Sequence, residues 1–333
     1  MPARPSASSQ PSPHAVPWAP SGTPAEDWNA SVTTAGDPAR RPARLTVGIV
    51  GAGRVGAVLG AALARAGHRV TAASAVSKAS LARAERLLPG VPIVPPPDVL
   101  ARSELVLLTV PDDVLPGLVE GLATAEPVRP GQLVVHTSGR YGVRVLDALT
   151  RRGALPLALH PAMTFTGRAE DLTRLAGACF GVTAPDQLRP IADALVLEMG
   201  GDPQWVEEDR RPLYHAALAG GANHLSTLVN ESVDLLRRCG VADPERLLAP
   251  LLYAALDNAL RQGDSALTGP VARGDAGTVA AHVRELREVS PHAVNAYVAM
   301  ARLTADRALA AGILKADDAE ALLDALAEGA ADQ

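Results

Sequence analysis

The stretch that decides the fold reads Leu45-Thr46-Val47-Gly48-Ile49-Val50-Gly51-Ala52-Gly53-Arg54-Val55-Gly56. Its first half is a short apolar run, which is typical of a strand buried in a parallel sheet. Its second half has the pattern G-x-G-x-x-G and leads into an Ala- and Leu-rich segment, 54–66, that predicts a helix. Such a glycine pattern is a weak signal alone. Between a strand and a helix it predicts the turn of a βαβ unit that binds a dinucleotide.

The glycines of this turn have separate physical roles. Gly51 permits a tight turn, Gly53 lets the backbone approach a pyrophosphate, and Gly56 permits close packing of the helix on the sheet. The helix N-terminus adds free N–H groups and the positive end of its dipole. We therefore predict that the cofactor is bound by a contiguous set of residues: Gly51, Ala52, Gly53, Arg54, Val55 and Gly56.

Strand and helix patterns alternate from residue 45 to about 207, which predicts a right-handed, doubly wound parallel sheet. The expected strands are 45–50, 68–73, 105–110, 132–136 and 154–160, extended by 178–183 and 204–206. The expected helices are 54–66, 78–88, 113–124, 140–151 and 186–199.

Beyond residue 208 only helical patterns follow. Asp243-Pro244 and Ser290-Pro291 each pair an N-cap residue with a proline suited to the first turn, and Gly240 and Gly312 suit C-caps. The sequence thus predicts an α/β protein in which an N-terminal doubly wound Rossmann domain, 45–207, is followed by an all-helical C-terminal domain, 208–333, that contributes to the substrate site. The expected helices are 209–238, 244–262, 276–288, 291–311 and 316–330.

Composition excludes several classes of protein. The formal net charge is −5, without a basic stripe interleaved with aromatic residues, which argues against nucleic acid as a partner. No apolar run suits a membrane span, and residues 1–44, rich in Pro and Ser, are predicted to be a disordered tail without a secretory signal. The distant Cys179 and Cys239 predict buried free thiols in a reducing, cytoplasmic compartment. No metal-ligand spacing occurs, so we expect no metal.

The end of the second strand bears on which dinucleotide binds. An NAD enzyme usually places Asp or Glu there, whereas the first acidic residue after Gly56 is Glu85. Ser74, Ser77 and Lys78 offer hydroxyls and a positive charge, which suit a 2′-phosphate. We therefore expect NADP (NADPH) rather than NAD. The alternative is that these residues cap the helix at 78–88, and Ser77 could do both.

Two further loops follow strands that should end at the same edge of the sheet. Ligands of open α/β sheets lie at the carboxyl ends of the strands, so both loops should border the cofactor. The alternative is that they are ordinary strand-to-helix turns, in which Asp112 or Asp113 caps a helix. The expected cofactor contacts are Val110, Pro111, Asp112, Thr137, Ser138 and Gly139.

Other short motifs accompany the glycine turn. They are Val110-Pro111-Asp112, His136–Gly139, His160–Phe165, Tyr214–Ala217 with Asn223, Leu267–Pro270 and Arg273–Asp275. Over residues 45–330 the chain resembles the superfamily of 6-phosphogluconate dehydrogenase-like and pyrroline-5-carboxylate reductase-like NADP oxidoreductases. Within it, the chain is most similar to a bacterial family that joins a Rossmann-like domain to a helical C-terminal domain of unknown function. The resemblance implies an NADP-dependent oxidoreductase that is usually a homodimer.

One departure from that superfamily concerns its chemistry. Its hydroxyacid dehydrogenases and ketopantoate reductases place a catalytic lysine on a helix of the second domain. Lys78 and Lys315 are the only lysines of this chain, so that acid–base route is absent or another residue fills it. The resemblance is closer here to pyrroline-5-carboxylate reductases, which work without such a lysine.

Histidines are the candidate proton donors. His215 and Asn223, eight residues apart on one predicted helix, lie about 80° from two full turns and could border one cleft, with Tyr214 as a further donor. His160 ends a strand at the carboxyl edge of the sheet. His136 is a weaker candidate because it could lie inside its strand. The alternative for these histidines is a structural role in a cap, a core or a turn.

A turn into a helix offers a site for a substrate carboxylate. Thr268, Gly269 and Arg273 could bind it through a hydroxyl, backbone N–H groups and a guanidinium. The alternative is a plain helix–helix loop with Asp275 as N-cap.

These features predict an oxidoreductase that uses NADPH to reduce a small carbonyl or imine acid, a keto acid or a pyrroline-carboxylate-like compound. The first alternative is a non-catalytic NADPH-binding regulatory or sensor protein. The second is a structural dimer with a vestigial cofactor site. The expected partners are a small-molecule substrate and a second copy of the chain, with neither nucleic acid nor a membrane.

Overall fold

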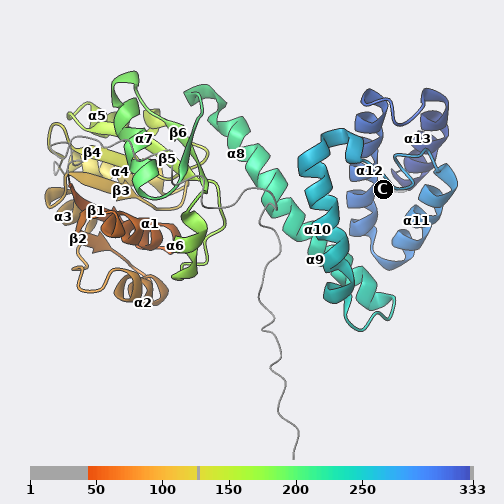
Figure 1. Cartoon of the computed structure of the whole chain (residues 1–333), viewed down its shortest axis with the longest axis horizontal. Coiled ribbons are helices and arrows are strands. Elements are labelled where there is room, and N and C mark those ends of the chain that lie inside the picture. The colour runs from red at the N-terminus through yellow and green to blue at the C-terminus, as the bar shows by residue number, and fades with distance from the viewer. Residues whose placement is uncertain (1–43, 126–127, 331–333) are drawn as a thin grey trace, which may run out of the picture. The chain divides into compact units, whose positions relative to one another are not determined.

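The structure is a computed structural model that describes residues 44–125 and 128–330 (Figure 1). Its contacts divide the described chain into two units. The sheet unit comprises the residues up to Ser138 together with Val143–Trp205, and the helical unit comprises Gly139–Gly142 and the residues from Val206 onward. The predicted tail, 1–44, lies outside the described residues except for its last position.

The sheet unit is built on seven strands in the order β2-β1-β3-β4-β5-β6-β7. The pairs from β2 to β5 are parallel, which confirms the predicted doubly wound α/β class. β6 is antiparallel to β5, and β7 is parallel to β6, so the added strands make a mixed sheet. The strands are β1 (Thr46–Val50), β2 (Arg69–Ser74), β3 (Leu105–Leu108), β4 (Leu133–His136), β5 (Leu155–Pro161), β6 (Cys179–Thr183) and β7 (Asp202–Trp205).

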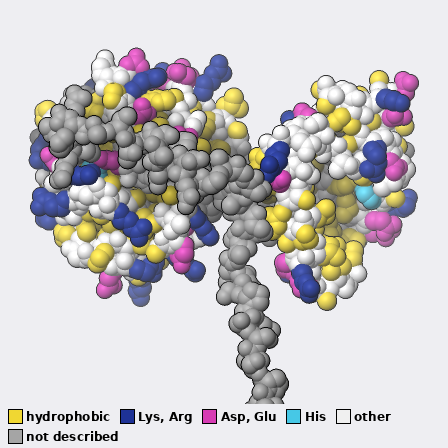
Figure 2. Space-filling model, viewed as in Figure 1, with side chains coloured by type: hydrophobic (Ala, Val, Ile, Leu, Met, Phe, Trp, Pro, Cys, Tyr) yellow, Lys and Arg dark blue, Asp and Glu magenta, His cyan; other side chains and the backbone are white. Residues whose placement is uncertain are grey.

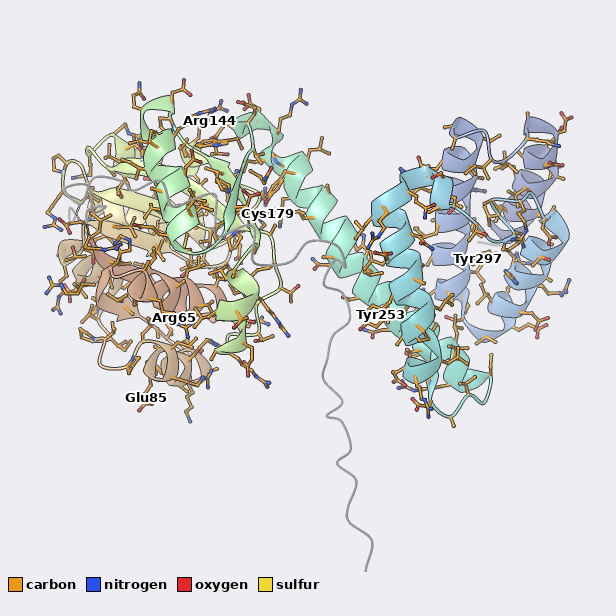
Figure 3. The ribbon with its side chains drawn as sticks, in the orientation of Figure 1. Arg65, Glu85, Arg144, Cys179, Tyr253 and Tyr297 are labelled. Atoms are coloured by element: carbon orange, nitrogen blue, oxygen red, sulfur yellow. The ribbon has the colours of Figure 1, made fainter. Side chains whose placement is uncertain are left out.

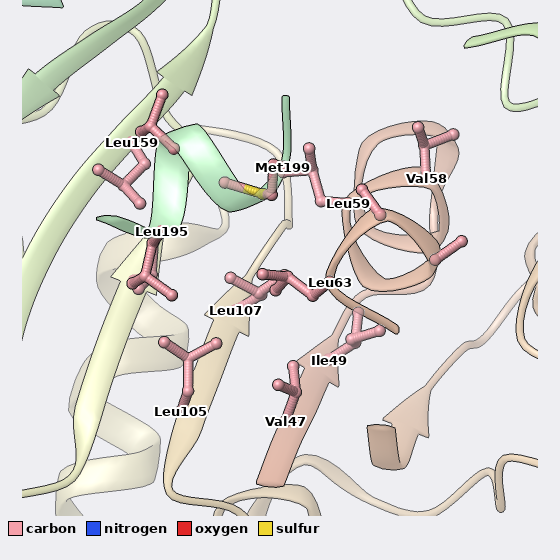
Figure 4. Packing of buried hydrophobic residues seen from close by; sticks show 14 of the residues in the cluster. Val47, Ile49, Val58, Leu59, Leu63, Leu105, Leu107, Leu159, Leu195 and Met199 are labelled. Carbon is pink, nitrogen blue, oxygen red and sulfur yellow. The ribbon is translucent and has the colours of Figure 1, made fainter. Parts of the chain in front are cut away.

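Apolar side chains from one face of the sheet and from its covering helices form the core (Figure 4). Ile49 of β1 and Leu107 of β3 pack in one cluster with Leu63 of α1 and Met199, just beyond α7. This packing holds the start of α1 against the end of β1, where the predicted cofactor turn lies. The helices of this unit are α1 (Arg54–Arg65), α2 (Lys78–Leu87), α3 (Pro96–Ala101), α4 (Leu115–Thr124), α5 (Asp147–Thr150), α6 (Glu170–Leu175) and α7 (Arg189–Glu198).

Two short helices and one shortened helix differ from the expectation. α3 and α6 each span only 6 residues, too few for a helical period to show in the sequence. The helix expected at 140–151 is reduced to a 3₁₀ turn, Val143–Leu146, and the single turn of α5. Gly142 and the β-branched Val143 and Val145 disfavour a regular helix there.

The helical unit holds a compact bundle of α11, α12 and α13, whose core includes Val279, Val298 and Leu322. The expected N-caps are confirmed, since the carboxylate of Asp243 accepts from the Arg246 N–H and the hydroxyl of Ser290 accepts from the Ala293 N–H. The helices are α8 (Arg211–Ala219), α9 (Leu225–Arg238), α10 (Pro244–Gln262), α11 (Ala276–Val289), α12 (Pro291–Ala310) and α13 (Ala316–Ala330).

The helix expected at 209–238 is interrupted. A π-helical turn, Gly220–His224, separates α8 from α9. The neighbouring glycines Gly220 and Gly221 weaken the regular helical preference at this point.

The two cysteines are free, but both are exposed, so the expected burial is wrong. Cys179 is the first residue of β6 (Figure 3) and Cys239 is the C-cap of α9, and the chain around each leaves its side chain exposed. In the part of the chain that the structure describes, no helix combines the length and apolarity that crossing a bilayer requires.

Candidate functional site

The glycine turn is held by the ends of two neighbouring strands. The Gly51 N–H donates to Ser74 Oγ at 3.0 Å, and the Ala52 N–H donates to the Ser74 carbonyl at 2.7 Å, both at the end of β2. The Thr109 hydroxyl, just beyond β3, donates to the Gly51 carbonyl at 2.6 Å. Gly51 has φ +95°, a conformation that glycine adopts without strain. The turn is therefore fixed before any ligand arrives.

The glycines of the turn face different surroundings. A Cβ on Gly56 would collide with the Thr109 hydroxyl and the Gly51 carbonyl, so this position requires close approach of helix and sheet. A Cβ on Gly53 would meet only the Gly51 carbonyl, at 3.8 Å, so Gly53 borders open space. Gly53 is also the N-cap of α1, and no side chain of the described residues caps that end. Open space in front of uncapped N–H groups fits a pyrophosphate.

Ser74 and Ser77 have local structural roles. Ser74 is buried, and its hydroxyl accepts the Gly51 N–H. The Ser77 hydroxyl accepts the Ser80 N–H at 3.1 Å, and Ser80 Oγ accepts the Ser77 N–H at 3.0 Å, which is a capping box at the start of α2. The alternative interpretation, capping, thus holds for Ser77. Lys78 is exposed on the first turn of α2.

The other two loops lie beyond the adjacent strands β3 and β4. Val110 and Asp112 are half-buried and Pro111 is exposed, and no side chain of the described residues caps α4. The alternative interpretation, in which Asp112 or Asp113 caps this helix, is therefore not what the structure shows. After β4, Thr137 is half-buried, Ser138 and Gly139 are buried, and Gly139 belongs to the helical unit.

His136 positions the second of these loops. It is the last residue of β4, and its side chain is fully buried. Its Nδ1 accepts the Ser138 N–H at 3.2 Å. His136 is thus a positioning residue for the loop after β4.

The loop between β5 and α6 has a defined structure that was not predicted from the sequence. Asp171, the second residue of α6, is fully buried. Its carboxylate accepts the Thr166 N–H at 2.8 Å, the Thr166 hydroxyl at 3.0 Å and the Gly167 N–H at 2.7 Å. The expected segment His160–Phe165 is therefore followed by a loop held by one buried carboxylate.

We expect Asp171→Ala to lower the free energy of unfolding of the sheet unit by about 2 kcal/mol, because the buried Gly167 N–H and the partly buried Thr166 N–H lose their acceptor. Asp171→Asn keeps one acceptor oxygen and should cost less. Urea unfolding followed by circular dichroism measures both variants. Equal stability of Asp171→Ala and the wild type would contradict the role given to this carboxylate.

The helical unit begins with a buried charge. Arg211, the first residue of α8, is fully buried, and its guanidinium lies 5.9 Å from the Tyr214 ring centroid. Burial lowers the pKa of Arg211 to about 10, while Tyr214 and Glu208 act to raise it. The guanidinium therefore stays charged at neutral pH. Sequence reasoning missed Arg211 because no local pattern separates a buried arginine from the many exposed ones.

The candidate proton donors come from different elements of the structure. Tyr214 and His215 are half-buried on α8, whereas Asn223 is exposed within the π-helical turn. The predicted angle between His215 and Asn223 assumed a regular α-helix, which the π turn replaces. His160 lies in the sheet unit, half-buried within β5 and paired with Gly181 of β6.

The candidate carboxylate site is a tight turn before α11. Gly269 has φ +94°, and its carbonyl accepts the Arg273 N–H at 3.2 Å. Thr268 and Arg273 are exposed. Asp275 caps α11, as the alternative interpretation required, and hydrogen bonds from the Thr278 N–H and hydroxyl lower the pKa of its carboxyl.

The described residues contain no group of three or more His, Cys, Asp or Glu side chains that could hold a metal ion. The glycine turn at the carboxyl end of β1 is the part of the structure that fits a dinucleotide. The fold and this turn place the protein in the class of Rossmann-type proteins with an appended helical domain.

Two family models each match part of the chain, and the second match begins within the sheet unit. Residues 31–161 match the Rossmann-like domain family, and residues 178–304 match a domain of unknown function, DUF2520. This pair of domains is the one that the sequence motifs led us to expect. It confirms the resemblance to Rossmann-like proteins with a helical C-terminal domain of unknown function.

One individual relative is similar to this chain at a low sequence identity. Over 172 residues the chain is 29% identical to a glycerol-3-phosphate dehydrogenase (NAD(P)+) from Bradyrhizobium sp. strain ORS 278. The match covers 46% of this chain. The chain spans about half the length of that relative, 50%.

Two solved structures share the fold. A Bacteroides fragilis protein assigned as an NADP oxidoreductase superposes with a TM-score of 0.65 at 20% identity, covering 79% of this chain and 98% of that one. Pyrroline carboxylate reductase from Plasmodium falciparum, with NADP bound, gives a TM-score of 0.50 at 10% identity, also over 79% and 98%.

Proposed function

We propose that this protein is an NADP-dependent oxidoreductase that reduces a small carbonyl or imine acid. The observation that carries the proposal is the turn Gly51–Gly56, in which Gly53 borders open space at an uncapped helix N-terminus. A pyrophosphate there would receive N–H groups at the positive end of α1. The NADP named for the Bacteroides and Plasmodium structures supports the same cofactor.

The preference for a phosphorylated cofactor rests on the end of β2. An acid that would bind the free ribose 2′-hydroxyl is missing between Gly56 and Glu85. A carboxylate at that position would repel a 2′-phosphate, so its absence favours NADP.

When bound, NADPH supplies the hydride, and the protein has to supply orientation and a proton. Because the chain has no lysine between Lys78 and Lys315, we assign the proton transfer to His215, with Tyr214 beside it on α8 and His160 as the second candidate. An imine that is already protonated needs less acid help than a ketone. The missing lysine therefore favours the imine version, as does the substrate named for the Plasmodium reductase.

We expect His215→Gln to lower kcat for a keto acid by roughly 10²- to 10⁴-fold, the usual contribution of a general acid, and to lower it less for a cyclic imino acid. The NADPH affinity should stay within about twofold, because the turn Gly51–Gly56 that carries the proposed pyrophosphate site does not include His215. Tyr214→Phe and His160→Gln are the comparisons. If His215→Gln turns over like the wild type, the proton donor is another group.

The direct test of the function is NADPH oxidation, followed by absorbance, with a panel of keto acids and cyclic imino acids, beside NADPH binding measured by calorimetry. Binding with turnover of a panel member supports the proposal. Binding without turnover favours the alternative of an NADPH sensor. Absence of binding contradicts both and leaves a structural role.

The helical unit also supports a homodimer, which we propose as the working form. Along α10, every residue from Tyr253 to Gln262 is exposed, although Leu256 and Leu260 are apolar. Figure 2 shows hydrophobic side chains gathered over α9 and α10, and Tyr253 of α10, labelled in Figure 3, is 59% exposed. Exposed apolar side chains gathered on one helix mark an interaction surface, so we expect a partner to cover this part of α10, although Asp257 and Arg261 form an ion pair on the same helix.

A groove beside α9 offers a place for that cover. Its volume is about 800 Å³, and apolar side chains such as Leu228 of α9 and Met300 of α12 line it. A second copy of the chain fits best as the occupant, because each copy presents both a groove and an uncovered helix. Two-fold symmetry then satisfies both surfaces at once.

A further inference from the structure

Three arginines converge on one glycine of the loop between β5 and α6. A Cβ on Gly167 would collide with Arg83 Nε and would lie 2.9 Å from Cγ of Arg54. Arg86 Nη2 donates to the Gly167 carbonyl at 3.1 Å. Arg83 and Arg86 come from α2, and Arg54 is the first residue of α1. The loop thus gathers positive side chains from two helices at the start of α1.

No carboxylate among the described residues neutralises this cluster through an ion pair to Arg54 or Arg83. Asp171 is engaged by the loop and lies 3.7 Å from Arg174 instead. Glu85 lies about 200° around α2 from Arg83, and Figure 3 shows it on the outer side of that helix. Like charges held together without a counter-charge create a positive potential that favours an anion.

The connection of α2 to β2 in the chain points to the anion. α2 follows β2, and the end of that strand reads the 2′ substituent of the adenosine ribose. The hydroxyls of Ser74 and Ser77 are engaged in holding the turn and capping α2. We infer that Arg83, with Arg54 and Arg86 beside it, binds the 2′-phosphate of NADP(H) and sets the preference over NAD.

This inference rests on the proposed function and deepens it. Guanidinium groups bind phosphate oxygens through charge-assisted hydrogen bonds, often two at once, which a glutamine cannot replace. Gly167 leaves space for Arg83 because it has no side chain and adopts φ +76°. Asp171, which accepts the Gly167 N–H, is therefore a positioning residue for the cluster.

The test is calorimetric binding of three probes, adenosine 2′,5′-bisphosphate, NADPH and NADH, to the wild type and to Arg83→Gln. We expect Arg83→Gln to weaken both 2′-phosphorylated probes by roughly 10- to 100-fold and to leave NADH within about twofold. Arg65→Gln, an exposed arginine in the last turn of α1, is the matched control and should change nothing. Gly167→Ala, which pushes a methyl group toward Arg83, should act in the same direction as Arg83→Gln.

Equal weakening of NADH and NADPH by Arg83→Gln would show that the cluster binds the pyrophosphate, and unchanged affinities would show that it binds neither phosphate. Both results overturn the inference. It is also overturned if the wild-type protein does not bind adenosine 2′,5′-bisphosphate. Failure of the proposed function would give another result. Arg83-dependent binding of the bisphosphate without any turnover would support the 2′-phosphate site and contradict the proposed enzymatic activity.

Discussion

Gly53→Asp should abolish measurable NADPH binding, with an affinity loss of at least about 100-fold. The substituted carboxylate would stand in the open space before α1, where a pyrophosphate requires N–H donors. Juxtaposed like charges cost several kcal/mol, and about 2.8 kcal/mol already corresponds to a hundredfold change. Fluorescence quenching or calorimetry with NADPH measures the loss.

The structure predicts that this variant folds. Gly53 has φ −74°, which an aspartate adopts easily, and a Cβ there would lie 3.8 Å from the nearest atom. Aspartate is also a favoured N-cap residue. Gly56→Ala is the contrasting control, because its methyl group collides with the Gly51 carbonyl and should lower stability as well as binding. If the Gly53→Asp variant still binds NADPH tightly, the turn Gly51–Gly56 is not part of the cofactor site.

Leu260→Glu should convert the protein from a dimer to a monomer at micromolar concentration. Leu260 is 79% exposed on α10, the highest exposure of any leucine in the described residues, and it lies on the helix that lacks a cover. Burying a leucine contributes about 1.5–3 kcal/mol, and a two-fold interface carries the substitution twice. The dissociation constant should therefore rise by more than about 100-fold. Analytical ultracentrifugation reports the change directly.

Leu197→Glu is the matched control. Leu197 is 62% exposed on α7 of the sheet unit, outside the helices proposed to dimerise, so this variant should sediment like the wild type. A wild type that is already monomeric would contradict the dimer proposal. A Leu260→Glu protein that stays dimeric would place the interface elsewhere than on α10.

The class of fold and most element positions could be predicted from the sequence. Local rules decide them: an apolar run predicts β1, a glycine pattern predicts the turn at Gly51–Gly56, and a side chain that caps a helix acts within three residues, as Asp243 and Ser290 do. The cofactor turn belongs to this group because all of its residues are contiguous.

Only those parts of the candidate site whose residues are close together in the chain could be predicted from the sequence. The residue types of Ser74 and Ser77 suggested a phosphate site, yet both hydroxyls serve the backbone around them. The predicted angle between His215 and Asn223 around the helix axis was based on a regular α-helix. The paired glycines Gly220 and Gly221 before Asn223 were the sequence signal for an interruption there.

The sequence by itself determined a Rossmann-type sheet unit with a glycine turn, followed by a helical unit, because each of those features follows from the order of nearby residues. Only the tertiary structure decided that β6 and β7 reverse direction, that Arg211 is buried and that Arg83 and Arg86 meet Gly167. Arg86 and Gly167 are 81 residues apart in the chain. Contacts of that separation depend on how helices pack across the sheet, which no local pattern specifies.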